Sequence, residues 1–203
     1  FRGLKVFTAG DETVSPLRLN PFALAQGTLV QTHIDYLKAL FAAAFVLYPP
    51  MPYVLDVCLQ EIYEDRGWNI ALNTNRRGDL QSAQVLPTLD ELDKKIDTVV
   101  NRLGYDRETM MNVRSGLHAR INQLRLGGGK GVMLNTRCSM PWADLLDGPC
   151  VIELKAMVSD DEKAFVMGLL LIQMYERCES MGASGGTLRH VTVIEEAHRL
   201  LRR

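Results

Sequence analysis

The sequence predicts an α/β fold in which parallel strands are interrupted by an all-helical insertion. Short runs rich in β-branched and apolar residues lie near the two ends of the chain, as is typical of buried strands. The residues between them carry apolar side chains at the spacing of amphipathic helices. We therefore expect residues 1–27 and 127–203 to form two parts of one α/β core, and residues 28–126 to form the helical insertion.

The first part of the core begins with a strand. Residues 4–8 (Leu-Lys-Val-Phe-Thr) suit a short strand, and residues 9–11 suit the turn after it. Pro16 and Pro21 exclude a regular helix from the next stretch, because proline lacks an N–H and restricts the residue before it. We expect an extended connector at residues 15–22.

The insertion begins with two helices. Apolar residues recur at helical spacing over residues 28–48, and the pattern stops before Pro49-Pro50. A second helix is expected over residues 53–66, with Gly67 at its end. The polar residues 68–87 predict an irregular segment.

Two further helices complete the insertion. Thr88 and Glu91 have the spacing of a capping box, and the apolar stripe that follows ends at Gly104. The next helix starts near Asp106, and residues 127–129, all glycine, stop it.

The second part of the core combines strands with one helix. Residues 132–134 and 151–154 have the composition of buried strands. Residues 159–162 (Ser-Asp-Asp-Glu) have a second capping-box pattern and open an apolar helix that extends to residue 181. After a loop at residues 182–186, we expect a final strand at residues 190–194.

Composition narrows the classes of function. With 203 residues, of which 47% are apolar, the chain can bury a sizeable core, and its length suits one or two domains. The net charge of −1 excludes a polycationic surface and leaves only local contacts with nucleic acid. The apolar runs are too short to span a bilayer, so we expect a cytoplasmic protein without membrane insertion. The cysteines lie far apart and predict buried thiols in a reducing compartment: Cys58, Cys138, Cys150 and Cys178.

The final strand-like run ends in two adjacent carboxylates, Glu195 and Glu196. This is the layout of a Walker B element, in which a buried strand delivers acids to Mg²⁺ and to a water beside the γ-phosphate of a nucleotide. The alternative is a core strand that runs into a helix whose first turn carries glutamates for dipole reasons. The pattern alone leaves both interpretations open.

The glycine-rich run at residues 127–131 includes Lys130 but does not match a Walker A loop. That loop requires Gly, four residues, then Gly-Lys-Ser/Thr, whereas Gly131 follows the lysine here and Leu124 occupies the first glycine position. A helix stop and turn is the better interpretation. No other segment matches, and the first residue is not Met, so we expect the phosphate-binding loop of a nucleotidase to lie outside this chain.

The residues Glu195-x-x-His198 also have the spacing of a di-iron ligand pair. Such sites need two of these units plus further glutamates on long helices, and only one unit occurs here. Structural, hydrogen-bonded histidines are the better interpretation.

Three arginines, Arg114, Arg120 and Arg125, lie on a helix whose other face is apolar. They are either a solvated face or candidates for an arginine finger, which would neutralise charge on the phosphoryl group in a neighbouring subunit.

Five segments of the chain follow one another in an order found in one protein superfamily. They are residues 15–22 (Ser-Pro-Leu-Arg-Leu-Asn-Pro-Phe), 61–68 (Glu-Ile-Tyr-Glu-Asp-Arg-Gly-Trp), 86–92 (Leu-Pro-Thr-Leu-Asp-Glu-Leu), 151–163 and 193–199 (Val-Ile-Glu-Glu-Ala-His-Arg). Together they resemble the HerA-like branch of the HerA/FtsK superfamily of hexameric DNA-pumping ATPases.

The resemblance implies a partial RecA-like P-loop core, ATP and Mg²⁺ as cofactors, and a homo-hexamer that moves double-stranded DNA, with a nuclease as a further partner. It also implies that Glu195 serves the Mg²⁺ shell through water and that Glu196 activates the attacking water. Because the Walker A loop is absent, we expect this chain alone to be inactive. Two alternatives stay open: a non-catalytic helical interaction module, and an ATPase of conjugation or type IV secretion on the same fold.

Overall fold

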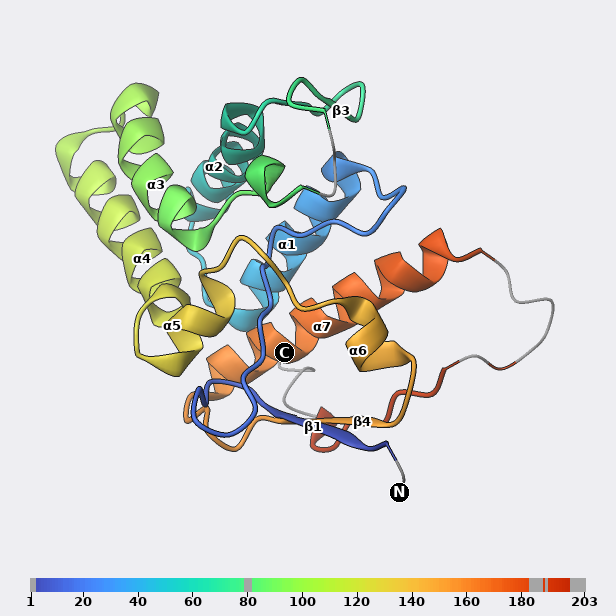
Figure 1. The fold of residues 1–203 in the computed structure, drawn as a ribbon. Coiled ribbons are helices and arrows are strands. Elements are labelled where there is room, and N and C mark those ends of the chain that lie inside the picture. The colour runs from blue at the N-terminus through green and yellow to red at the C-terminus, as the bar shows by residue number, and fades with distance from the viewer. Residues whose placement is uncertain (1–2, 79–81, 183–187, 189, 198–203) are drawn as a thin grey trace.

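The computed structural model describes residues 3–78, 82–182, 188 and 190–197 (Figure 1). Strand β1 (Lys5–Thr8) pairs in parallel with β4 (Cys150–Glu153) at one end of the molecule, with Thr8 opposite Glu153. This confirms both strands and their parallel direction. The fold is mixed α/β, but the described residues contain far less sheet than the predicted core.

All four helices predicted for the insertion are present. They are α1 (Val30–Ala44), α2 (Met51–Asp65), α3 (Leu89–Leu103) and α4 (Arg107–Arg125). Thr88 and Glu91 exchange side-chain and backbone hydrogen bonds, so the predicted capping box begins α3. Gly104 ends α3 in the left-handed conformation, with φ of 67°, and Asp106 caps α4 by accepting from the Thr109 N–H.

The segment predicted to be irregular, residues 68–87, contains a very short hairpin. Its strands are β2 (Trp68–Asn69) and β3 (Thr74–Asn75), and a 3₁₀ helix (Ala83–Val85) follows. The indole N–H of Trp68 donates a 2.8 Å hydrogen bond to the Val85 carbonyl, which holds the hairpin against the 3₁₀ helix.

The prediction of a strand at residues 132–134 is wrong, because these residues belong to helix α5 (Gly129–Leu134). The Val132 N–H donates to the Gly128 carbonyl at 3.2 Å, which is a helical bond. A three-residue apolar run does not distinguish a strand from a buried helical turn, since both bury such residues. A further short helix, α6 (Trp142–Leu146), has no counterpart among the predicted elements.

Of the last two predicted elements, a long helix and a final strand, only the helix is present. The long helix is confirmed as α7 (Asp160–Ser180). The strand at residues 190–194 is not formed, and these residues are irregular. A strand needs a neighbour for its N–H and C=O groups, and no described strand pairs with this segment. Its apolar side chains consequently face solvent, and Val193 is 83% exposed. Of the loop predicted at residues 182–186, only Gly182 lies within the described residues.

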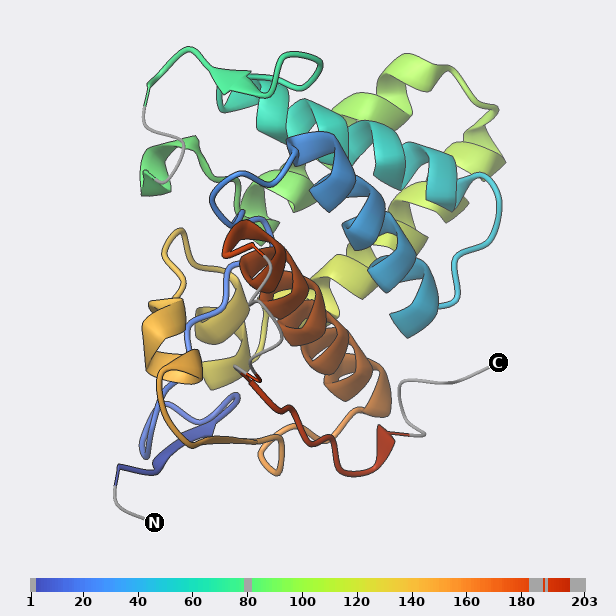
Figure 2. The same cartoon turned by 90° about the vertical axis from the view of Figure 1, so that its right-hand side faces the viewer.

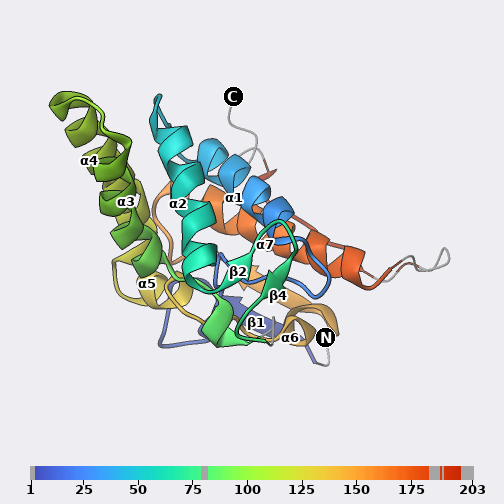
Figure 3. The same ribbon diagram turned by 90° about the horizontal axis from the view of Figure 1, so that it is seen from above.

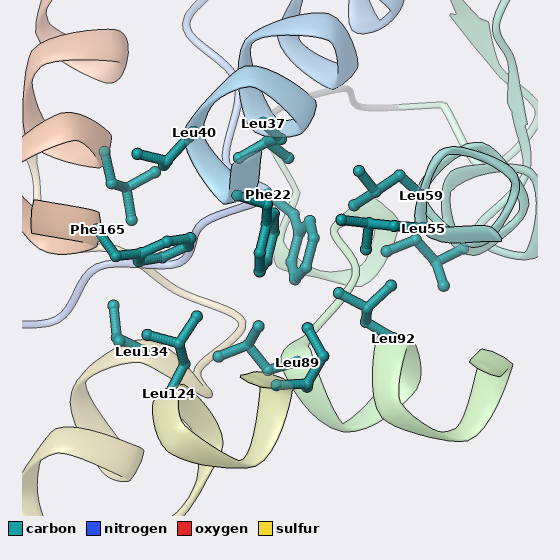
Figure 4. Packing of buried hydrophobic residues seen from close by; sticks show 14 of the residues in the cluster. Phe22, Leu37, Leu40, Leu55, Leu59, Leu89, Leu92, Leu124, Leu134 and Phe165 are labelled. Carbon is teal, nitrogen blue, oxygen red and sulfur yellow. The ribbon is translucent and has the colours of Figure 1, made fainter. Parts of the chain in front are cut away.

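The connector at residues 15–22 contains no regular helix, as predicted, and it runs into the centre of the core. Its last two residues form a turn, closed by a hydrogen bond from the Ala23 N–H to the Asn20 carbonyl. Figure 4 shows Phe22 surrounded by leucines of α1, α2, α3, α4 and α5, with Phe165 of α7 nearby. The three predicted segments therefore contribute to one hydrophobic cluster, which continues from the connector through the insertion to α7.

The helices lie in a simple arrangement around that core. Helix α7 packs against α1, as Figure 2 shows from the side. Helices α3 and α4 pack together as a pair on the side of α2 that faces away from α1, as Figure 3 shows from above. No helix among the described residues is long and apolar enough to cross a membrane.

Candidate functional site

The carboxyl ends of β1 and β4 meet at one edge of the sheet, the place where parallel α/β proteins usually bind ligands. The Thr8 hydroxyl donates a 3.2 Å hydrogen bond to Glu153 Oε2, and Lys155 Nζ lies 2.7 Å from the same oxygen. These hydrogen bonds, first that of Lys155 and then that of Thr8, lower the pKa of Glu153. The edge therefore presents a carboxylate that stays ionised.

The glycine-rich run at residues 127–131 packs against the loop that follows β1. Gly127 and Gly128, with φ of 97° and 59°, turn the chain from α4 into α5, which confirms the predicted helix stop. A β-carbon at Gly129 would overlap the carbonyl oxygen of Gly10, so only glycine permits this close approach. The run therefore joins α5 to the sheet edge.

The lysine of this run is already paired. Lys130 Nζ lies 2.6 Å from Oε1 of Glu162, a buried carboxylate in the first turn of α7. This pair explains why the capping box predicted at residues 159–162 is wrong: the Ser159 side chain makes no cap bond, and Glu162 turns to Lys130 instead. In a Walker A loop the lysine contacts phosphates, whereas here its charge is neutralised within the chain.

Glu195 and Glu196 lie in an exposed turn after residues 190–194. Glu196 has φ of 54°, in the left-handed region that few non-glycine residues adopt. The two carboxylates are adjacent, as the sequence requires, but the described structure does not place them at the end of a strand. His198 lies outside the described residues. The roles of both glutamates in Mg²⁺ binding and catalysis stay predictions.

The three arginines of α4 all make bonds within the chain. Arg114 forms an ion pair with Asp97 of α3, in which Arg114 Nε lies 3.0 Å from Asp97 Oδ1. The angle at Nε does not fit a hydrogen bond. Arg125 Nη1 donates to Asp90 of α3 at 2.9 Å. Arg120 differs, because it bonds to backbone carbonyls, one of them in the loop between α1 and α2. These contacts hold α4 to its neighbours, and a role for any of the three across subunits stays a prediction.

Sequence reasoning missed a buried polar residue at the centre of the fold, Asn20. Its amide donates to the carbonyls of Pro87 (3.1 Å) and Arg137 (3.3 Å), and its Oδ1 accepts from the Phe22 N–H at 2.9 Å. The Asn20 N–H itself donates to Ser139 Oγ at 2.8 Å. Asn20 thereby ties the connector to the segments before α3 and after α5. Its position inside an apolar stretch, between leucine and proline-phenylalanine, was the available signal.

A second set of polar side chains is buried where α1 crosses α7. It consists of His33, Gln173 and Glu176. Gln173 donates a 2.7 Å hydrogen bond to the Asn20 carbonyl, which connects this set to the connector. Gln173 and Glu176 follow the apolar buried residues Ala164, Phe165, Val166 and Leu169 on the packed face of α7. Polar residues at these positions of an apolar face were the signal in the sequence.

The cysteines form no disulfide, but they are not all buried as predicted. Cys58 is buried, and desolvation raises the pKa of its thiol to about 12. Cys150 is half-buried. Cys138, in the irregular segment between α5 and α6, and Cys178, near the end of α7, are exposed. No group of three or more His, Cys, Asp or Glu residues in the described ranges is arranged to hold a metal ion.

Comparisons with known proteins give a likeness of fold. No protein-family model and no curated protein matches the chain. Its structure is similar to that of VirB4 of Thermoanaerobacter pseudethanolicus, with a TM-score of 0.60 and 16% sequence identity. The match covers 87% of this chain and 44% of the VirB4 chain, so the chain spans less than half of that protein. The two proteins therefore share a fold over most of this chain.

Proposed function

We propose that this chain is part of a P-loop ATPase of the conjugation or type IV secretion kind, and that the intact protein uses ATP and Mg²⁺. The observation that carries the proposal is the fold shared with VirB4 over 87% of the chain. The resemblance of five ordered sequence segments to HerA/FtsK ATPases supports it independently, because that resemblance depends on the order of residues and not on the fold.

In this proposal the acid pair performs the chemistry that a Walker B element supplies. Glu195 holds Mg²⁺ through its water shell, and Glu196 orients and deprotonates the attacking water. Both side chains are exposed in one turn, which leaves them accessible to a nucleotide. The alternating valines of residues 190–194 would be buried if this segment joined the sheet as a strand, and we propose that it does so in the nucleotide-bound protein.

The phosphates of the nucleotide must be held by residues that this sequence does not contain. The only Gly-Lys pair in the sequence places Lys130 against Glu162 and is not followed by Ser or Thr. Most of the binding free energy for a triphosphate comes from loop amides, lysine and Mg²⁺ around the phosphates. The chain alone is therefore expected to bind ATP weakly and to hydrolyse it negligibly.

Among the three arginines, Arg120 is the strongest candidate for an arginine finger. Arg114 and Arg125 form ion pairs with acids of α3, and a move toward another subunit would break those pairs. Arg120 bonds only to backbone carbonyls, within the described structure, so its charge has no acid partner to leave.

The test uses the intact protein, which in this proposal carries a Gly-rich loop ending in Gly-Lys-Ser/Thr outside residues 1–203. Mg²⁺-dependent ATP hydrolysis should fall on the order of a hundredfold or more in Glu196→Gln, because a positioned general base is lost. Glu195→Gln should raise the Mg²⁺ concentration needed for half-maximal activity. Glu108→Gln, which changes an exposed acid in the first turn of α4, is the matched control and should turn over ATP like the wild type. Equal turnover by wild type and Glu196→Gln would contradict the assignment.

The polymer that such a motor moves is a separate proposal. The HerA-like resemblance favours double-stranded DNA, a homo-hexameric ring and a partner nuclease. Stimulation of ATPase activity by double-stranded DNA, together with a hexameric mass in light scattering, would support this second candidate. Absence of ATP binding by the intact protein would instead favour a non-catalytic helical interaction module.

A further inference from the structure

A cleft lies between the start of α1 and the end of α7, and it is lined by neither Glu195 nor Glu196. Figure 2 shows these two helices side by side. Its volume is about 400 Å³. The side chains that matter for its chemistry come from both helices: Tyr36 of α1, and Tyr175, Glu176 and Glu179 of α7. No lysine or arginine is among the described residues that line it.

One wall of the cleft holds a buried carboxylate that is only half bonded. The side chain of Glu176 is 2% exposed. Its Oε1 lies 2.7 Å from His33 Nδ1, whereas its Oε2 has no hydrogen-bond partner among the described residues. His33 Nε2 lies 2.9 Å from the Pro21 carbonyl, which can only accept, so Nε2 carries a hydrogen. The 2.7 Å contact between His33 Nδ1 and Glu176 Oε1 is a hydrogen bond, and Oε2 receives no hydrogen bond from the part of the chain that the structure describes. Burying such an atom unpaired is unfavourable.

The cleft also has aromatic walls. The rings of Tyr36 and Tyr175 meet edge to face, with centroids 6.2 Å apart and an interplanar angle of 85°. Tyr175 is 54% exposed, so part of its ring is open to a ligand. The faces of such rings attract cations, and Arg guanidinium groups stack on them especially well.

The charged residues around the cleft also favour binding of a cation. Glu179 lies one helical turn after Tyr175, and Glu176 and Glu179 both stand near the C-terminal end of α7. Carboxylates at that end of a helix add to the partial negative charge of the backbone, which is unfavourable without a compensating cation. Arg177, the basic residue in the last turn, does not line the cleft.

We propose that the α1–α7 cleft binds a guanidinium group. The planar cation lies against Tyr175 and Tyr36 and pairs with Glu179, over the wall of the cleft to which the buried carboxylate of Glu176 belongs. The group is carried either by a small organic cation or by an arginine side chain of a peptide. The proposal stands independently of ATP hydrolysis, since it uses none of the residues assigned to the nucleotide.

The test is isothermal titration of the full chain with N-acetyl-arginine amide, and with N-acetyl-citrulline amide as the uncharged analogue of the same shape. The arginine compound should bind at least about tenfold more tightly, as expected for a cation in contact with carboxylates and aromatic rings. Tyr175→Leu and Glu179→Gln change exposed side chains and should each weaken that binding by about two- to fivefold. Tyr53→Leu and Glu108→Gln are matched exposed controls elsewhere on the surface and should leave it unchanged.

The remaining outcomes distinguish a peptide ligand from a small cation, and they include the results that would overturn the proposal. Tighter binding of the peptide Gly-Arg-Gly than of arginine amide indicates a peptide ligand, and equal binding indicates a small cation. Equal binding of the arginine and citrulline compounds, no binding of either, or arginine binding that survives both cleft substitutions would overturn the proposal. Glu176→Gln, checked for folding by circular dichroism, should also weaken arginine binding, because it removes a carboxylate from the wall of the cleft.

Discussion

Asn20→Ala should be among the most destabilising single substitutions in this chain. The residue is fully buried, and its side chain bonds to three backbone groups of three different segments. Alanine removes all three bonds. It leaves the Pro87 carbonyl and the Phe22 N–H unpaired inside the core, whereas the Arg137 carbonyl, which has the longest bond, lies closer to solvent.

The magnitude follows from these two stranded groups. A buried backbone group left without a partner costs about 1–3 kcal/mol, and the lost packing of the amide adds a little more. We expect the free energy of unfolding to fall by about 3–5 kcal/mol. With an m-value of about 2.5 kcal/mol per molar urea, the unfolding midpoint should fall by about 1–2 M.

The assay is urea unfolding followed by circular dichroism, with Asn112→Ala as the matched control. Asn112 is exposed on α4, so its substitution should change stability by less than about 0.5 kcal/mol. If Asn20→Ala lowered the free energy of unfolding by less than about 1 kcal/mol with an unchanged m-value, the amide would not be a central tie of the fold.

Three further predictions use the same assay. Tyr63→Phe removes the hydroxyl that donates 2.8 Å to the buried Phe22 carbonyl, so it should destabilise by about 1–2 kcal/mol, and an unchanged midpoint would show that water replaces the hydroxyl. Gly129→Ala should destabilise by about 1–3 kcal/mol because its β-carbon meets the Gly10 carbonyl, whereas Gly148→Ala, where the β-carbon meets open space, should be nearly neutral; equal effects would contradict the tight packing. His118 lies 2.6 Å from Asp93 and 3.3 Å from Asp97; burial lowers its pKa, but these hydrogen bonds outweigh burial and raise the pKa above 6.5. Its stabilisation should be complete below pH 6.5 and be lost as the pH rises through the raised pKa, so a pH dependence that persists in His118→Gln would assign it to another group.

Local signals account for the parts of the fold that the sequence predicts correctly. Thr88, Glu91, Gly104 and Asp106 act on backbone groups within a few residues of themselves, so their roles can be read without knowing the fold. The second capping-box pattern fails for the opposite reason. Glu162 has a competing partner, Lys130, 32 residues away, and no local pattern reports that competition.

The candidate sites show the same division. The adjacent acids Glu195 and Glu196 are visible as a pattern, but whether they stand at a strand end depends on a neighbouring strand. The pair His33–Glu176 joins residues 143 positions apart, and Asn20 reaches Arg137 across 117 positions. Only the presence of polar residues in apolar stretches signals them beforehand, and that signal does not identify their partners.

The most direct test of the proposed ATPase is a crystal structure of the intact protein with Mg²⁺ and a non-hydrolysable ATP analogue. We expect residues 190–194 to form a strand in the sheet that contains β4, with Glu195 in the water shell of Mg²⁺ and Glu196 one water from the γ-phosphate. A nucleotide bound elsewhere, with Glu196 still in an exposed turn remote from the phosphates, would contradict the account.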